Sequence, residues 1–181
     1  MSKARLKKEI STFSGEQLIE LILNAYDSSK EAKSYFEFFL NPDADTLLEK
    51  KKEAIGKEAR RSKWGTSKAR ISRIKAEIKA VEGLGVGAEY VGRLRFFAIR
   101  ELVMLGKYLN YTNAFVGSID KMVGEYLEYM AKNGMLLSAI GDLDKLIINN
   151  PDAGTERFRR HLHIIVGNAV RDLRGRLGLT I

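Results

Sequence analysis

The residues of this sequence whose types and spacing best suit binding of a ligand are the positively charged ones between positions 57 and 75. Eight Lys or Arg residues lie there against one acidic residue, Glu58, and the chain's only tryptophan lies among them. The candidate binding residues are Lys57, Arg60, Arg61, Lys63, Trp64, Lys68, Arg70, Arg73 and Lys75. Cations spaced along a chain can follow the phosphates of a nucleic acid or another polyanion, and an exposed indole can stack on a base.

The net charge of +8 is concentrated in and around this segment. Residues 50–79 hold 12 of the 31 Lys and Arg residues but 3 of the 23 Asp and Glu residues, so the rest of the chain is close to neutral. A second interpretation is equally physical, because Lys and Arg stems often cover a solvated helix surface and a tryptophan can pack into a helix junction. This interpretation, or an acidic protein partner, is favoured over nucleic acid.

Residues for catalysis or metal binding do not assemble into a recognisable site. His161 and His163 are two positions apart on an expected helix, which turns them about 200° from each other, so they cannot share one metal ion. The chain has no cysteine, which excludes disulfides and zinc–thiolate sites. The glycines at 83–87 follow an expected helix rather than a strand, so a turn between helices is favoured over a phosphate loop. We expect no catalytic residue, no metal and no cofactor, and we lean against an enzyme.

The segments that position these residues repeat their apolar residues at helical spacing almost throughout the chain, so we expect them to be helices. The most regular pattern starts at Thr112 and predicts a core stripe on one helix face. Its members include Phe115, Ile119, Met122, Tyr126 and Leu127. The pairs Ser14/Gln17 and Ser28/Glu31 each predict a capping box. We expect an all-α fold with about eight main helices and a short basic N-terminal helix, packed as antiparallel pairs in a bundle or a short helical-repeat-like stack.

Glycines and prolines add two expectations about packing and helix starts. Gly117 and Gly124 lie seven residues apart on the Thr112 helix, and Gly92 and Gly167 lie inside two others, so we expect close approach of neighbouring helices at these positions. The two prolines lie in "NPDADT" at 41–46 and "NPDAGT" at 150–155. Because the apolar patterns after these two stretches do not match, we interpret them as two uses of the same helix-start chemistry rather than as a duplication.

Several stretches resemble an uncharacterised bacterial family of small basic helical proteins, a domain of unknown function. They are "SGEQLIELILNAYD", "KEAKSYFEFFLNPD", "LLEK" and the Lys/Arg-rich stretch, with a weaker similarity in "YTNAFVGSID" and "EYLEYMAKNGMLL". The resemblance covers roughly residues 1–145. It implies a helical fold, and it carries no catalytic residue onto this chain.

The expected organisation is a single helical domain over residues 1–181, with the basic turn around Trp64 and Gly65, residues 62–67, as the candidate sub-boundary. No secretory signal and no apolar run of membrane-spanning length is evident, so we expect a cytoplasmic protein without membrane contact. The favoured function is a non-enzymatic binding or scaffold protein with a protein partner. The alternative is an RNA- or DNA-binding accessory protein that uses residues 57–75, and the second alternative is an enzyme with an unrecognised site.

Overall fold

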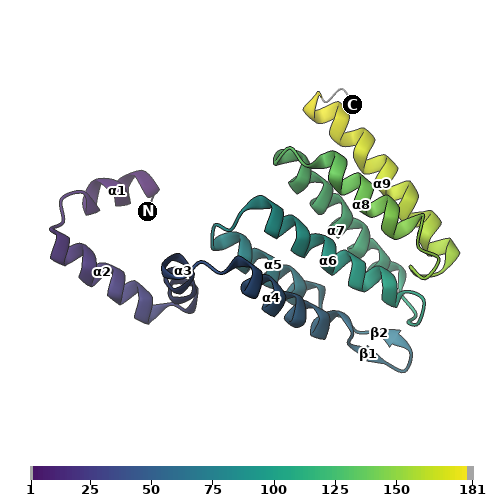
Figure 1. Cartoon of the computed structure of the whole chain (residues 1–181), viewed down its shortest axis with the longest axis horizontal. Helices are drawn as coiled ribbons and strands as arrows, with labels where there is room; N and C mark the ends of the chain where they lie inside the picture. The colour runs from purple at the N-terminus through teal and green to yellow at the C-terminus, as the bar shows by residue number, and fades with distance from the viewer. Residues whose placement is uncertain (1, 179–181) are drawn as a thin grey trace. The chain divides into compact units, whose positions relative to one another are not determined.

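The computed structural model describes residues 2–178, and this part of the chain contains nine helices and one two-stranded hairpin (Figure 1). The helices are α1 (Lys3–Ile10), α2 (Gly15–Ser28), α3 (Lys30–Leu40), α4 (Ala44–Ala59), α5 (Ile71–Gly83), α6 (Ala88–Leu105), α7 (Asn113–Lys132), α8 (Leu136–Ile147) and α9 (Glu156–Leu177). The hairpin pairs β1 (Ser62–Lys63) with β2 (Thr66–Ser67). The all-α class is therefore confirmed. The strands were not expected, because two residues are too few to show an alternating pattern.

Contacts divide the chain into two compact units. The N-terminal unit ends at Asp43 and contains α1–α3, whereas the main unit begins at Ala44 and contains α4–α9. The turn at 62–67 lies inside the main unit. Within the described residues, no helix combines the length and the apolar character that crossing a bilayer requires.

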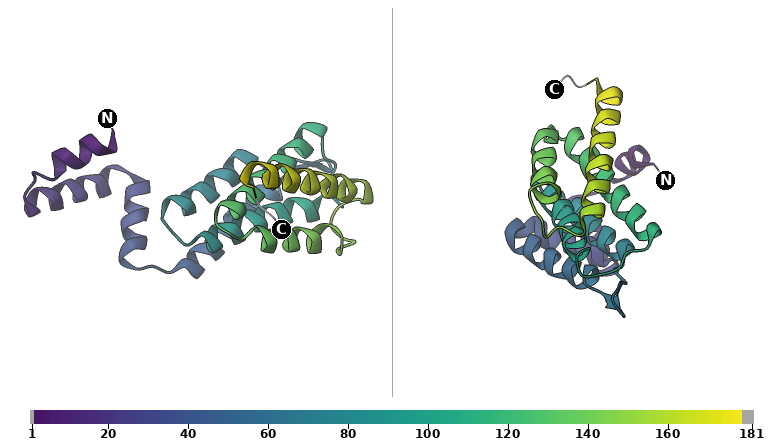
Figure 2. Two further views of the ribbon diagram at one scale, coloured as in Figure 1. Left: turned by 90° about the horizontal axis from the view of Figure 1, so that it is seen from above. Right: turned by 90° about the vertical axis from the view of Figure 1, so that its right-hand side faces the viewer.

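The helices of the main unit pack in the order in which they follow one another. Helices α4 and α5 pack against α6, α6 packs against α7, and α7 packs against α8 and α9. Figures 1 and 2 show these successive layers, with the β-hairpin projecting beyond the helices next to α4 and α5. In this arrangement the chain segment that links α6 to α7 lies beside the hairpin.

Helix α7 supplies the centre of the core. The hydroxyl of Thr112 accepts a hydrogen bond from the Phe115 N–H at 3.3 Å and starts the helix. The predicted stripe is confirmed: Ile119, Met122, Tyr126 and Leu127 are buried, and Phe115 is half-buried against the core. Full burial of such side chains stabilises a fold by about 1.5–3 kcal/mol each, which fixes α7 between its neighbours.

The glycines in the helices do not all serve the same purpose. A Cβ at Gly92 would lie 2.6 Å from the sulfur of Met130, so the end of a side chain from α7 fills the space beside this glycine of α6. The predicted contact with a neighbouring helix is present there, but it is made by a side chain and not by close approach of the two backbones. At Gly117, Gly124 and Gly167 a Cβ would meet nothing within 4 Å. The prediction of tight packing at these three positions was therefore wrong, because they lie on sides of α7 and α9 that no other helix among residues 2–178 approaches.

Capping in the N-terminal unit follows the sequence closely but not completely. Ser14 and Gln17 form the predicted capping box, with Ser14 N–H donating to Gln17 Oε1 at 2.8 Å. The second predicted cap is off by one residue. Ser28 ends α2, and Ser29 accepts from the Ala32 N–H at 3.2 Å to start α3.

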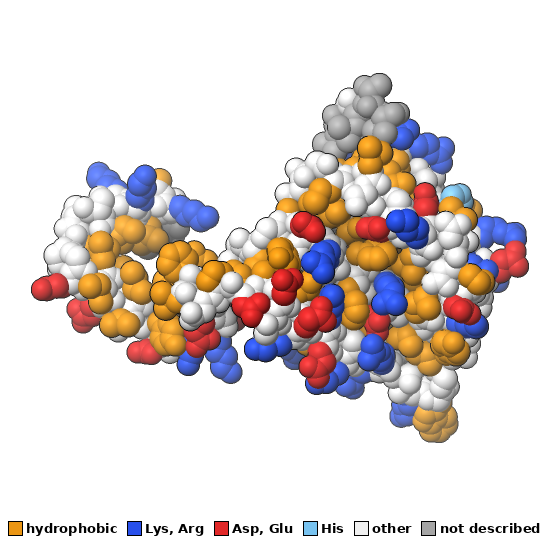
Figure 3. All heavy atoms as spheres, viewed as in Figure 1, with side chains coloured by type: hydrophobic (Ala, Val, Ile, Leu, Met, Phe, Trp, Pro, Cys, Tyr) orange, Lys and Arg blue, Asp and Glu red, His pale blue; other side chains and the backbone are white. Residues whose placement is uncertain are grey.

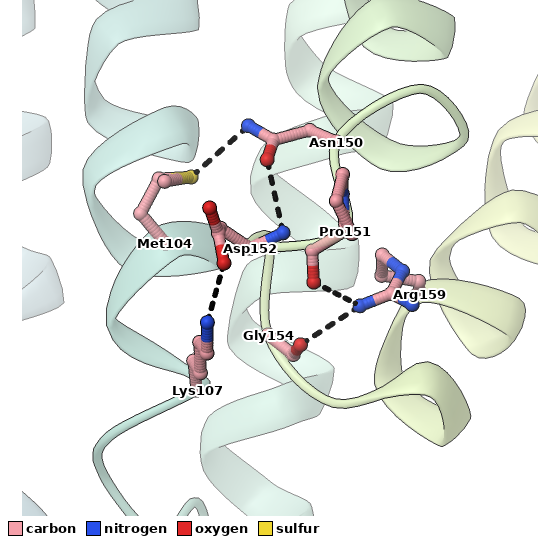
Figure 4. Close-up of polar contacts among 7 residues, drawn as sticks. All are labelled: Met104, Lys107, Asn150, Pro151, Asp152, Gly154 and Arg159. Atoms are coloured by element: carbon pink, nitrogen blue, oxygen red, sulfur yellow. Dashed lines mark hydrogen bonds and ion pairs between the residues drawn. The ribbon is translucent and has the colours of Figure 1, made fainter.

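The "NPDAGT" loop is a folded turn before α9 rather than the first turn of that helix (Figure 4). Thr155 caps α9, so Pro151 and Asp152 lie outside the first turn of the helix that this stretch was expected to start. Asp152 instead accepts a hydrogen bond from Lys107, and this bond holds the pKa of its carboxyl below the ordinary value. Arg159 closes the turn from the other side by donating to the carbonyl oxygens of Pro151 at 2.8 Å and Gly154 at 3.0 Å.

Candidate functional site

The β-hairpin carries Trp64 at its tip. Ser62 pairs with Ser67 and Lys63 with Thr66, which leaves Trp64 and Gly65 as the two turn residues. Their φ angles are +56° and +71°. Two central residues with positive φ are typical of a type I′ hairpin turn, a position that glycine and asparagine accept and that strains a bulky side chain. The turn predicted around Trp64 and Gly65 is present, but it is part of a hairpin and not of a helix junction.

The backbone of Asn110, in the connection between α6 and α7, fixes the hairpin to the main unit. Asn110 N–H donates to the Gly65 carbonyl at 2.7 Å, and its own carbonyl accepts from the Ser67 N–H at 3.1 Å. A further bond joins Lys68 N–H to the Arg61 carbonyl at 2.8 Å across the base. These bonds tie the hairpin to a fixed point on the main unit, so its tip has a defined place.

The side chain of Trp64 is 90% exposed, so it does not pack into a helix junction. The Nζ of Lys63 lies over the Trp64 ring, 5.7 Å from the ring centroid. Figure 3 shows hydrophobic and basic side chains together at the end of this hairpin. An indole face beside an ammonium group, both in solvent, is an arrangement that suits stacking on a base next to a phosphate.

The eight predicted cations separate into two groups of four. The first group binds carboxylates of the main unit: Lys57 pairs with Glu53, Arg60 with Glu101, Arg70 with Glu58 and Lys75 with Glu125, at 2.7, 2.7, 3.0 and 2.8 Å. Three of these pairs join different elements and position them. Exposed ion pairs contribute little to stability, about 0–1 kcal/mol each, but they neutralise these four cations.

The second group consists of Arg61, Lys63, Lys68 and Arg73. All four are exposed, and none pairs with a carboxylate within residues 2–178. Three of them belong to the hairpin or flank it directly, and Arg73 lies in the first turn of α5. The structure therefore places the unneutralised charge of the segment around Trp64.

A groove of about 580 Å³ adjoins the hairpin anchor, between the α6–α7 connection and the start of α9. Its lining includes Tyr108, Asn110, Asn113, Arg157 and His161. Tyr108 is 71% exposed, and the ammonium of Lys107 lies 5.9 Å from its ring centroid. The sequence did not reveal this groove, because its walls come from segments about 50 residues apart.

The two histidines have different surroundings. His161 contacts both carboxylate oxygens of Asp120 on α7 through Nε2, at 3.0 and 2.9 Å, whereas His163 is exposed. The partner of His161 could not be read from the sequence, since Asp120 is 41 residues away. Among residues 2–178, no three His, Asp or Glu side chains lie where they could hold a metal ion together.

The N-terminal unit offers a second candidate surface, made of apolar side chains. None of the residues in α1, α2 or α3 is buried. Nine large hydrophobic side chains of this unit are each at least 40% exposed. They are Leu6, Phe13, Ile19, Leu21, Ile22, Leu23, Tyr35, Phe39 and Leu40, and Figure 3 shows hydrophobic side chains over the surface of this unit.

The fold and these two surfaces define a helical protein that presents a basic hairpin with an exposed tryptophan and an apolar N-terminal unit. The chain belongs to a family of unknown function, DUF6155, whose model matches residues 1–149. The resemblance to a domain of unknown function is thereby confirmed. Neither the curated proteins nor the solved structures contained a match to this chain.

Proposed function

We propose that this chain is a non-enzymatic binding protein whose N-terminal unit docks on a protein partner. One observation carries the proposal: α1–α3 contain no buried residue although they hold nine large apolar side chains. Isolated helices of 8–14 residues are marginal in water, and a unit this small cannot bury enough surface to stabilise itself. A partner surface that covers the apolar side chains supplies the missing burial, worth about 1.5–3 kcal/mol for each large side chain.

The charges of the unit favour a protein partner with an apolar groove and a mixed rim. Helix α1 is basic, with Lys3, Arg5, Lys7 and Lys8 against Glu9, whereas the charged residues of α2 are Glu16, Glu20 and Asp27. Amphipathic helices commonly bind partners by laying an apolar face into such a groove. Contiguous apolar surface of this kind is a recognised mark of an interaction site.

Affinity capture from a lysate of the native cells, treated with nuclease, tests the proposal. We compare the native chain with the triple variant Ile19→Ser, Leu23→Ser and Phe39→Ser. The matched control is Ile164→Ser on α9, since Ile19 and Ile164 are 60% and 56% exposed. The native chain and the control are expected to retain the same partner, and the triple variant is expected to lose it. Capture of the same partner by the triple variant would contradict the proposal.

Nucleic-acid binding by residues 57–75 is the second candidate function, favoured by the exposure of Trp64 and by the four unpaired cations around it. With four cations engaged, the logarithm of the affinity for duplex DNA should fall with the logarithm of the salt concentration with a slope of about −3.6, and of about −2.8 on a single strand. Changing Arg61, Lys63, Lys68 and Arg73 to Gln should remove most of this slope. Changing Lys57 and Arg60, which are ion-paired, should alter it less, and equal effects of the two sets would contradict this assignment.

We also propose a cytoplasmic location. The absence of cysteine from the chain supports it, because proteins of oxidising compartments commonly use disulfides. Fractionation of native cells with an antibody against the chain tests the location. Recovery in the extracellular or periplasmic fraction would contradict it.

A further inference from the structure

We propose that the hairpin tip, Tyr108 and the adjoining groove form one continuous site for single-stranded nucleic acid. The inference rests on the second candidate function. It extends that function from the basic segment to the α6–α7 connection and to the start of α9. It also specifies an unpaired strand, with stacked bases, as the ligand.

Trp64 occupies a strained backbone position. At φ +56° an L-residue is strained by roughly 1–2 kcal/mol, and asparagine or glycine would adopt this turn with less strain. Because the indole is 90% exposed, burial does not offset the strain. A strained backbone that presents a large aromatic side chain to solvent, at the end of an anchored hairpin, points to a ligand for that side chain.

A second exposed aromatic side chain, Tyr108, lies next to the residue that anchors the hairpin. Asn110 bonds to the carbonyl of Gly65, next to Trp64, and Tyr108 is two residues before Asn110. Tyr108 is 71% exposed, and the ammonium of Lys107 near its ring is paired with Asp152, whereas the ammonium of Lys63 near Trp64 has no carboxylate partner among residues 2–178. Two exposed rings of this kind match the stacking platforms that proteins use for unpaired bases, because every base has a face to stack.

The groove beyond Tyr108 is lined by polar groups that suit a nucleotide. Exposed Asn110 and Asn113 bring amide donors and acceptors to its wall, and exposed Arg157 brings a cation. The carboxylate of Asp120 at this wall is paired with His161. A volume of about 580 Å³ lies within the range of small-ligand sites, so the groove has room for a nucleotide.

A duplex does not suit this site, because its bases are already stacked on one another and cannot present their faces to the two rings. An unpaired strand can place one base on Trp64, another on Tyr108, and its phosphates near Lys63, Arg61 and Arg157. Both RNA and DNA single strands have these groups. The assay therefore includes a strand of each kind.

The experiment uses the full chain and the fluorescence of Trp64, which is the only tryptophan and so reports on the hairpin tip directly. Unlabelled oligo-U, oligo-dT and a DNA duplex of equal length are titrated at low salt. Stacking on a single strand is expected to quench the indole emission, whereas the duplex should leave it nearly unchanged. Fluorescence anisotropy with labelled strands then gives the affinities of Trp64→Ala and Tyr108→Ala, and Leu137→Ala on α8, where the side chain is 64% exposed, is the control.

Each of the two site variants is expected to weaken single-strand binding roughly 5- to 150-fold, which is the range for loss of one stacked base, and to leave duplex binding unchanged. The control variant is expected to bind the single strands as tightly as the native chain does. If Trp64→Ala weakens binding and Tyr108→Ala does not, the continuous site is overturned while binding by the basic segment stands. If the strands bind without quenching and neither variant matters, stacking is overturned and charge alone accounts for binding. If dissociation constants for strand and duplex both exceed about 10⁻⁴ M, the second candidate function falls as well.

Discussion

The contrast among three glycines gives a direct test of the packing of α6 and α7. Gly117 and Gly124 lie on α7 with no atom within 4 Å of the position of a Cβ. Changing either to Ala should raise the free energy of unfolding by about 1 kcal/mol, because Ala is the better helix former. The two positions are seven residues, or about 10 Å, apart along the helix, so the effects should add to about 2 kcal/mol in the double variant.

Gly92 on α6 is the matched control, since the same propensity gain applies there. A methyl at Gly92 would meet the Met130 sulfur at 2.6 Å and its Cε at 3.3 Å. These atoms are the end of a flexible side chain that borders a cavity of about 500 Å³, so they can move at a small cost. Gly92→Ala should therefore gain clearly less than the helix term of about 1 kcal/mol.

Urea denaturation followed by helical circular dichroism, with equal slopes among the variants, measures all three changes. A lower free energy of unfolding in both Gly117→Ala and Gly124→Ala would contradict the open space at these two positions. A gain in Gly92→Ala as large as in those two variants would contradict the contact between position 92 and Met130.

Three further predictions concern the core, the tyrosines and the N-terminal unit. Ile119→Ala should lower the free energy of unfolding, measured by urea denaturation, by about 2–5 kcal/mol, because the side chain is fully buried. A loss below about 0.5 kcal/mol would contradict the place of Ile119 in the core. Burial raises the pKa of Tyr111 and of Tyr126. Their contribution to stability is therefore complete below the ordinary tyrosine pKa of about 10 and declines as the pH rises above it. A free energy of unfolding that stays constant from pH 9 to pH 11 would contradict the raised pKa of these two tyrosines. A chain that begins at Ala44 should unfold cooperatively with nearly native stability, because every described buried residue lies at Leu48 or beyond, and loss of cooperative unfolding would show that α1–α3 are needed for the fold.

Features that depend on residues within about four positions of one another could be predicted from the sequence. The helical class, the α7 stripe from Ile119 to Leu127 and the capping box at Ser14 all follow from such local spacing. The turn at Trp64 was also predicted, since Gly65 marks it. The hairpin around this turn was missed, because its strands are held in part by the backbone of a residue far along the chain.

Only the tertiary structure decided how these local features are used. Lys57 and Lys63 are alike in the sequence, yet one is neutralised by an ion pair and the other stands beside an exposed indole. Gly92 and Gly124 are both glycines inside helices, yet only Gly92 has a neighbouring side chain within van der Waals contact of its Cβ position. The apolar face of α2 has the same periodicity as that of α7, but it is exposed. Periodicity shows that a face can be buried, whereas its actual burial depends on which distant elements lie against it, and the spacing of residues along one helix does not contain that information.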